Sequence, residues 1–286
     1  MPRCLIVYYS QGGTTARVAE SIAAGLRAAE YQVDLYNMID GRPPDLDGYD
    51  LLGIGAPVYY FRMPFTVMDY VNDLPDLTGV PTFVFLLYGT FRGNAGNLVR
   101  HALADKGARE VGYFCCMGGD YYLGYLEQGY LFSPDHPTAE ELAQAEAFGR
   151  RIAAHAAGEP YDRPGDDPQP ILIHRLERSL VNRWLVNQVY SRLFVVDAEQ
   201  CTACGLCMQV CPTRNIAEDA NKRPVWGRDC EACLFCALKC PQGAITSPAS
   251  GWFFRPLMVF NVRYAARDPS LDHVRVTHRR GRTRWV

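Results

Sequence analysis

The feature that most constrains this 286-residue chain is a cysteine pattern that occurs twice towards its C-terminal end. Both copies have the spacing C-x2-C-x2-C-x3-C-P, and the second begins at Cys230, 29 residues after Cys201 begins the first. Three cysteines in so short an arc can direct their sulfur atoms at three corners of one iron-sulfur cube, while the next turn carries the fourth cysteine past that cube. The fourth cysteine of each copy therefore serves the other cube, and the two copies must fold together.

The spacing predicts two [4Fe-4S] clusters whose ligands are exchanged between the copies. The expected ligands are Cys201, Cys204, Cys207 and Cys240 for the first cluster, and Cys230, Cys233, Cys236 and Cys211 for the second. A pair of zinc sites and a disulfide framework are the alternatives, but zinc ribbons usually use paired C-x-x-C hooks, and both alternatives predict looser spacing. We expect Pro212 and Pro241 to form turns, and Gly205 to let the backbone approach a cluster.

Length and composition are those of an ordinary globular protein with room for two domains. Eight of the 11 cysteines belong to the pattern, and we expect the other three, Cys4, Cys115 and Cys116, on buried strands. A net charge of -2 gives no reason to expect nucleic acid as a partner. The apolar stretch at residues 1 to 9 is too short for the core of a signal peptide, and no run approaches a membrane span, so we expect a cytoplasmic protein.

The first half of the chain alternates between apolar runs and helical patterns. Strands are expected at residues 3–9, 32–38, 49–55, 81–88 and 110–117. The helices between them include one with Val18, Ile22 and Leu26 on one face, one at 64–74, one at 94–106, and one begun by a capping box of Thr138 and Glu141. Such alternation predicts an α/β fold with a five-stranded flavodoxin-like parallel sheet of order 2-1-3-4-5. A small α+β domain with the two clusters is expected to follow it.

Ligands of such sheets bind beyond the carboxyl ends of the strands, at the point where the strand order reverses. The segment from Ser10 to Thr15 follows the first strand, and its glycines, hydroxyls and following helix are suited to bind a phosphate. Two aromatic loops follow the third and fourth strands and are able to enclose a planar ring. The candidates for stacking are Tyr59 or Tyr60 and Tyr88 or Phe91, and those for backbone contacts are Pro57, Val58 and Gly89. Packing at the sheet edge is the alternative for several of these tyrosines.

These motifs resemble known families. Ser10-Gln-Gly-Gly-Thr-Thr15 is similar to the flavodoxin phosphate loop [ST]-x-T-G-x-T, with Gly12 where threonine is common, and residues 195–247 resemble the bacterial ferredoxin with two [4Fe-4S] clusters. The whole chain resembles flavodoxin/ferredoxin fusion proteins of anaerobic bacteria and archaea, which often carry Tyr-Gly-Asn-Arg where this chain has Tyr88-Gly-Thr-Phe91. The resemblance implies FMN as a cofactor. The expected FMN contacts are Ser10, Gln11, Gly12, Gly13, Thr14, Thr15, Pro57, Val58, Tyr59, Tyr60, Tyr88, Gly89, Thr90, Phe91, Gly93, Asn94, Gly119 and Asp120.

The predicted domains are a flavodoxin-like FMN-binding domain at 1–157, a linker and bridging helix at 158–194, a ferredoxin domain at 195–247 and a basic, aromatic tail at 248–286. The bridging helix is expected from Ile171 to Phe194, where apolar residues recur at helical spacing. The tail holds eight arginines against two aspartates. It is either a surface for an acidic redox partner or a solvated extension whose aromatic residues clamp the two domains, and charge runs favour the second interpretation.

The expected function is electron transfer between FMN and the two clusters, and then to or from a separate redox partner protein, with no membrane span. One alternative is a flavin-dependent reductase of a quinone or another small molecule, driven by NAD(P)H or ferredoxin. No G-x-G-x-x-G follows a strand, so a separate dinucleotide-binding domain is not expected. A regulatory or assembly module with iron-sulfur clusters is a further alternative. The histidines His101, His136 and His155 are assigned no chemistry.

Overall fold

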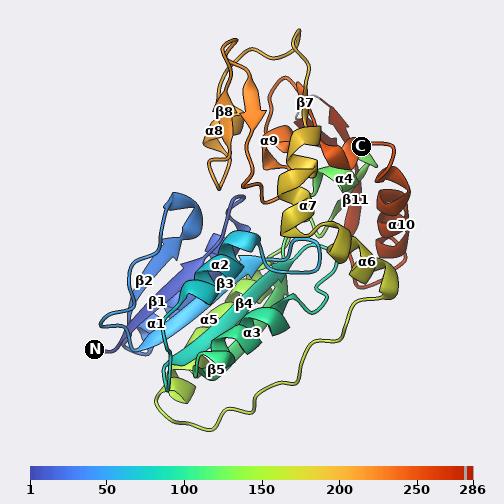
Figure 1. Ribbon diagram of the computed structural model, residues 1–286. Helices are drawn as coiled ribbons and strands as arrows, with labels where there is room; N and C mark the ends of the chain where they lie inside the picture. Colours follow the sequence, from blue (N-terminus) through green and yellow to red (C-terminus); the bar gives the residue numbers. More distant parts are fainter. Residues whose placement is uncertain (280–281, 286) are drawn as a thin grey trace. The chain divides into compact units, whose positions relative to one another are not determined.

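The computed structural model describes residues 1–279 and 282–285 (Figure 1). The chain forms two compact units. The first unit comprises residues 1–118 and 135–176, and the second comprises residues 119–134 and 177–286. These units do not follow the boundaries expected from the sequence, because residues 119–134 leave the first unit and residues 158–176 join it.

The first unit is built on a five-stranded parallel sheet. The order of its strands is β2-β1-β3-β4-β5, as predicted. The strands are β1 (Arg3–Tyr8), β2 (Gln32–Asn37), β3 (Leu51–Pro57), β4 (Pro81–Tyr88) and β5 (Arg109–Met117). A parallel sheet whose two faces are both covered requires apolar residues on both sides of its strands, and this explains the continuous apolar runs of β3 and β4.

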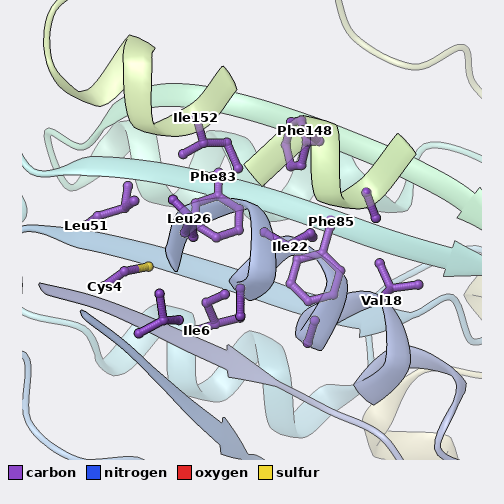
Figure 2. Close-up of a cluster of buried hydrophobic side chains, with 14 of the residues drawn as sticks. Cys4, Ile6, Val18, Ile22, Leu26, Leu51, Phe83, Phe85, Phe148 and Ile152 are labelled. Atoms are coloured by element: carbon purple, nitrogen blue, oxygen red, sulfur yellow. The ribbon is translucent and has the colours of Figure 1, made fainter. Parts of the chain in front are cut away.

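Helices cover both faces of this sheet. The helices of the first unit are α1 (Thr14–Ala28), the 3-10 turn η1 (Met38–Asp40), α2 (Phe65–Asp73), α3 (Ala95–Asp105) and α5 (Ala139–Ala156). One core lies between the sheet and the pair α1 and α5, and Figure 2 shows Phe83 and Phe85 of β4 beside Ile22 and Phe148 within it. A second core packs α2 and α3 on the opposite face. Alternate residues of each strand therefore serve different cores.

Two positions of β3 must be glycine because phenyl rings of β4 pack directly against the backbone there. A Cβ atom at Gly53 would lie 2.3 Å from the ring of Phe83, and one at Gly55 would lie 1.9 Å from the ring of Phe85. The two phenyl rings of β4 thus lie directly over the backbone of β3, where no side chain can stand. The capping box predicted for α5 is confirmed, since Thr138 Oγ1 accepts from the N–H of Glu141 and Glu141 Oε2 accepts from the N–H of Thr138.

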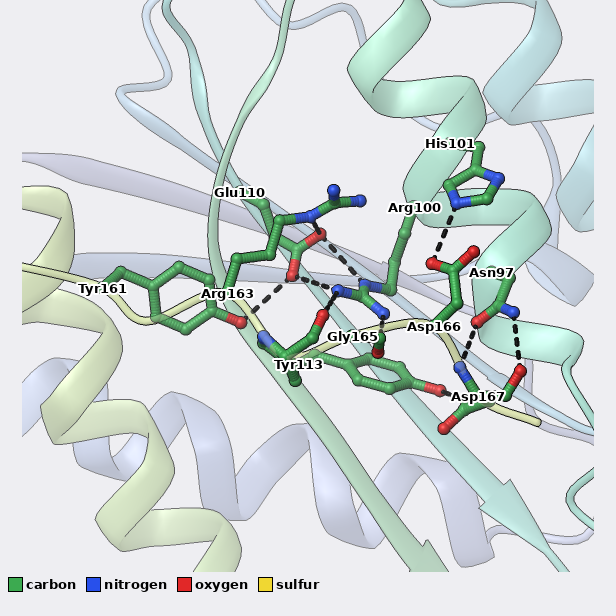
Figure 3. A network of polar contacts seen from close by, with 11 residues as sticks. Asn97, Arg100, His101, Glu110, Tyr113, Tyr161, Arg163, Gly165, Asp166 and Asp167 are labelled. Carbon is green, nitrogen blue, oxygen red and sulfur yellow. Dashed lines mark hydrogen bonds and ion pairs between the residues drawn. The ribbon is translucent and has the colours of Figure 1, made fainter.

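Residues 158–170, called the strap below, contain no helix or strand and are held against the first unit by polar contacts (Figure 3). Arg100 of α3, only 2% exposed, donates two hydrogen bonds to Glu110 of β5, at 3.0 and 2.9 Å. It also donates to the carbonyl oxygens of Pro164 (2.7 Å) and Gly165 (3.3 Å). Arg163 adds a third donor to Glu110 at 3.0 Å. A buried guanidinium therefore satisfies both a carboxylate and the carbonyls of the strap.

The prediction of a single bridging helix from Ile171 to Phe194 is wrong. The segment forms α6 (Leu172–Leu180), α7 (Arg183–Gln188) and the 3-10 turn η2 (Tyr190–Leu193). The break occurs at Asn182, whose side chain donates to Ser179 O at 2.7 Å and accepts from the N–H of Leu185 at 3.0 Å. Asparagine is favoured as an N-cap, so one side chain begins α7 just after α6 ends.

The cysteine repeats of the second unit form a small α+β region. It contains the antiparallel pairs β7 with β10 and β8 with β9, as well as two short helices. These elements are β7 (Val195–Val196), α8 (Leu206–Gln209), β8 (Ile216–Glu218), β9 (Pro224–Trp226), α9 (Phe235–Leu238) and β10 (Ile245–Thr246).

The tail is not the solvated extension that was favoured from the sequence. It forms the 3-10 turn η3 (Pro248–Ser250), α10 (Arg255–Ala265), β11 (His273–Arg279) and β12 (Arg282–Trp285). Strand β11 pairs with β12 and with β6 (Tyr130–Phe132), which follows α4 (Leu123–Glu127) in residues 119–134. Val276 of β11 is buried against Leu126 and Leu131, and this apolar contact orders the tail. Arg280, one of its eight arginines, lies outside the described residues.

Candidate cofactor sites

The predicted phosphate loop joins β1 to α1. Its first residue is fixed by Asn37, which accepts from the N–H of Ser10 (3.0 Å) and donates to its carbonyl oxygen (2.9 Å). Gly13, the residue before α1, has a φ of +89°, a conformation that favours glycine. Gly12 and Gly13 are exposed, and a Cβ atom at either would meet nothing within 4 Å. The first turn of α1 has no acidic residue. An open loop at the positive end of a helix suits a phosphate group.

The second predicted loop contacts the first. The Tyr59 hydroxyl donates to Gln11 Oε1 at 2.9 Å, and the Tyr59 ring lies edge-on to Tyr9 with 6.1 Å between the ring centroids. Tyr60 and Phe61 both have positive φ angles, of 49° and 63°, within a turn closed by hydrogen bonds between Tyr59 and Arg62. The structure therefore brings Gln11 and Tyr59 together, as expected for one binding region.

An aromatic cluster that the sequence did not reveal joins the second and third predicted loops to α6. His174 of α6 stacks on Phe61 at 4.4 Å and lies 4.5 Å from Phe91, while the two phenyl centroids are 5.9 Å apart. Phe61 and His174 are only 4% and 3% exposed. Phe91, a predicted stacking residue, thus packs on His174 and Phe61. No local pattern marks His174, because its partners lie more than 80 residues away.

The strap reaches the same loop through one carboxylate. Asp167 forms an ion pair with Arg92 at 2.8 Å and accepts a hydrogen bond from the Tyr113 hydroxyl. Burial raises the pKa of Tyr113, and the nearby Cys115 thiol and this hydrogen bond to Asp167 raise it further. Burial also raises the pKa of Tyr88, against the opposing charge of Arg92. Asp167 thereby connects the strap to the loop that follows β4.

The other predicted FMN residues are distributed as follows. Thr15, Thr90 and Asn94 are buried, and Thr14, Pro57, Val58, Gly89 and Gly93 are half-buried. Gly119 and Asp120 belong to the second unit, where the N–H of Asp120 donates to Phe132 O at 2.9 Å. Two free cysteines, Cys4 and Cys116, are buried on strands as expected, and Cys115 is half-buried on β5.

In the second unit, the fourth cysteine of each repeat lies beside the other repeat. Burial raises the pKa of Cys230 and of Cys236 to about 12, and the charge of Cys211 contributes to both increases. Burial likewise raises the pKa of Cys207, with contributions from Cys204 and Cys240. The charge of one thiolate can affect another thiol in this way only when the two sulfur atoms lie near each other. The structure therefore groups Cys211 with Cys230 and Cys236, and Cys240 with Cys207.

The backbone around the cysteines has the same form in both repeats. Ala203 and Ala232 have φ values of 54° and 55°, and Gly205 and Leu234 have values of 73° and 57°. Main-chain N–H groups donate to sulfur at 3.3 Å from Asn215 to Cys211, from Ala232 to Cys230 and from Ala244 to Cys240. Hydrogen bonds of this kind stabilise sulfur ligands in the thiolate form. The donor set, thiols with amide hydrogen bonds to their sulfur atoms, fits iron-sulfur clusters.

Within the described part of the chain, no group of three or more His, Cys, Asp or Glu residues is arranged to hold a single metal ion. No helix of that part is long and apolar enough to cross a membrane.

Two family models match segments of the chain. Residues 5–127 match the family model described as a flavodoxin domain, and residues 194–217 match that of a 4Fe-4S binding domain. The chain combines an N-terminal flavodoxin domain with a C-terminal ferredoxin-like region. Together, these two matches support an electron-transfer protein that combines a flavin domain with an iron-sulfur domain.

The matched relatives cover about half of this chain. An uncharacterised protein of Methanocaldococcus jannaschii is 27% identical over 153 residues, which are 52% of this chain and 97% of that protein. A protein named NAD(P)H dehydrogenase (quinone) from Paraburkholderia phymatum is 24% identical over 153 residues, 46% of this chain and 73% of its own length. Among solved structures, an archaeal flavodoxin is 19% identical, with a TM-score of 0.39 over 54% of this chain and 99% of its own.

Proposed function

We propose that this protein passes electrons between FMN, bound by the flavodoxin domain, and two [4Fe-4S] clusters, and exchanges them with a separate redox partner protein. FMN can accept two electrons and release them singly, whereas each cluster carries one. The chain would therefore couple a two-electron carrier to one-electron carriers.

The proposal depends above all on the exchanged placement of the cysteines. Two separate tetrahedral metal sites would use the four cysteines of one repeat together. Instead, the charge of Cys211 raises the pKa of two thiols of the second repeat, Cys230 and Cys236. The charge of Cys240 raises the pKa of Cys207 in the first repeat. This arrangement supports the quartets Cys201, Cys204, Cys207, Cys240 and Cys230, Cys233, Cys236, Cys211. The amide donors of Asn215, Ala232 and Ala244 would hold the thiolates in place.

The residues of the first unit would hold the flavin. The open Gly12 and Gly13 and the N–H groups that begin α1 would bind its phosphate. The loops after β3 and β4 would flank the ring, with Tyr59 held in place by Gln11. The Phe61, Phe91 and His174 cluster would exclude water from one side of these loops.

Pairs of cysteine substitutions test the exchange. After anaerobic reconstitution with iron, sulfide and FMN, the unaltered chain is expected to hold about eight iron atoms and about one FMN. The Cys207→Ala, Cys240→Ala double variant removes two ligands of one proposed cluster, so about four iron atoms should remain. The Cys207→Ala, Cys211→Ala variant removes one ligand from each cluster and should retain almost none.

The opposite result for the two double variants would show that each repeat holds its own cluster. Cys116→Ala, a substitution of a buried thiol outside the repeats, is the control and should keep about eight iron atoms. Full iron content without flavin, even with FMN supplied in excess, would refute the flavin half of the proposal.

The second candidate function is that of a flavin-dependent reductase of a quinone or another small molecule. It is favoured by the similarity to proteins named NAD(P)H dehydrogenase (quinone). Steady-state oxidation of NADH or NADPH with a quinone as acceptor would support it. Reduction by a protein donor alone, with no turnover of NADH or NADPH, would support the electron carrier.

A further inference from the structure

The two cysteine repeats have the same backbone form but differ at two positions close to sulfur. An offset of 29 residues relates Asp197 to Trp226 and Asn215 to Ala244. In the first repeat, Asp197 Oδ1 accepts from the N–H groups of Glu199 (2.9 Å) and Gln200 (3.3 Å), which stabilises the turn before Cys201. Trp226 cannot accept such bonds. Its presence in the second repeat therefore needs another explanation.

The indole ring of Trp226 is held in one orientation with its N–H group inside the protein. It stacks on Phe194 with 4.7 Å between centroids and an angle of 5° between the ring planes. Its Nε1 atom is buried and forms no hydrogen bond of normal geometry. The indole N–H group lies beside the thiol of Cys236. A buried donor of this kind is costly unless an acceptor is supplied.

Asn215 presents a second buried donor. Its side-chain Oδ1 accepts from the N–H of Asp229 at 2.7 Å, and its own N–H donates to Cys211 Sγ at 3.3 Å. Its Nδ2 atom is buried without a hydrogen-bond partner. The equivalent residue of the second repeat, Ala244, makes the same backbone contact to Cys240, which is a proposed ligand of the first cluster, but has no side-chain donor. Both additional donors, Trp226 Nε1 and Asn215 Nδ2, therefore accompany cysteines of the second quartet.

We propose that Trp226 and Asn215 set the reduction potential of the second cluster by directing their side-chain N–H groups at its sulfur atoms. The inference rests on the proposed two-cluster function. Reduction adds one electron to a cluster without forming or breaking a bond, and N–H donors stabilise the added negative charge on sulfur. These two residues therefore favour reduction of the second cluster. Asp229 and Glu231, beside Cys230, act in the opposite direction, and Asp229 is paired with Arg183 at 3.3 Å.

The test is an anaerobic redox titration of the full reconstituted chain, with dithionite as the electron donor and electron paramagnetic resonance as the readout. The Cys207→Ala, Cys240→Ala variant, which keeps the second cluster, identifies the signal of that cluster. Replacing Trp226 with Phe keeps the stacking on Phe194 and removes the donor. The equilibrium constant for reduction of the second cluster should fall about tenfold, as expected for one hydrogen bond to a charged group, while that of the first cluster stays unchanged.

Trp184→Phe is the matched control, because Trp184 is 67% exposed. Asn215→Ala is the second variant and should shift the same cluster in the same direction. An equal shift of both clusters, or no shift in either variant with about eight iron atoms retained, would overturn the inference. A failure of the proposed function is recognised separately, because the unaltered chain would then not hold about eight iron atoms.

Discussion

The ion pair between Asp167 and Arg92 offers a direct test of whether the strap organises the flavin site. Substitution of Asp167 with Asn removes the charge but not the side chain. The backbone of residue 167 is held independently, since its N–H donates to Asn97 Oδ1 (2.9 Å) and its carbonyl oxygen accepts from Asn97 Nδ2 (3.0 Å). The strap should therefore stay in place while the contact with the loop after β4 weakens.

The size of the effect follows from the burial of the pair. The Asp167 side chain is 7% exposed and the Arg92 side chain 36%, at a separation of 2.8 Å. Breaking a fully buried pair costs about 3 to 5 kcal/mol, and an exposed pair contributes about 1 kcal/mol or less. Because Arg92 is partly exposed, we expect the loss of this ion pair to cost about 1 to 3 kcal/mol of stability, between these two limits. If the lost stabilisation leaves residues 88–94 less ordered, FMN binding must order them, and the dissociation constant of FMN rises by about 5 to 150-fold.

The assay is a titration of flavin-free protein with FMN, followed by the quenching of flavin fluorescence. Asp34→Asn is a closely matched control, because Asp34 also pairs with an arginine (Arg3, 3.0 Å) and accepts from a tyrosine hydroxyl (Tyr49, 2.8 Å). Asp34 lies near the start of β2, whereas the flavin is expected at the other end of the strands. Equal FMN affinity for the two variants would refute the role assigned to Asp167.

Two further predictions concern the stability of the two units. Gly55→Ala should lower the free energy of unfolding by about 1 to 3 kcal/mol, because its Cβ atom would overlap the ring of Phe85; Gly12→Ala, in open space, is the control, and thermal unfolding is the measurement. Burial raises the pKa of Glu177 from 4.5 to about 7, so the folded state retains a proton that the unfolded state has already lost. The stability contributed by this group is present below pH 4.5 and is lost as the pH rises towards 7, by about 3 kcal/mol in all. Glu177→Gln should remove this pH dependence of the thermal midpoint, and an unchanged dependence would contradict the assignment.

The parts of the fold that the sequence predicted are those determined by neighbouring residues. The apolar runs of β3 and β4 and the capping box at Thr138 depend on contacts within a few residues or on the burial of a whole segment. The failures have non-local causes. Strand β11 is ordered by pairing with β6, more than 130 residues earlier, and no pattern in the tail indicates this partner. The prediction of one long helix was wrong because the apolar residues keep their helical spacing on both sides of Asn182. The side chain of Asn182 nevertheless caps the start of a new helix.

The same distinction separates the two candidate sites. The cysteine spacing encodes the geometry expected of a cluster within about a dozen residues, so the proposed ligand sets can be predicted from the sequence alone. The loops predicted to flank the flavin instead pack against Asp167 and His174, which lie more than 70 residues from Arg92 and Phe91. The repeats combine both kinds of information. Their shared backbone form at Ala203 and Ala232 positions the proposed ligands alike, whereas side chains such as Trp226, which stacks on the distant Phe194, make the surroundings of the two repeats unequal.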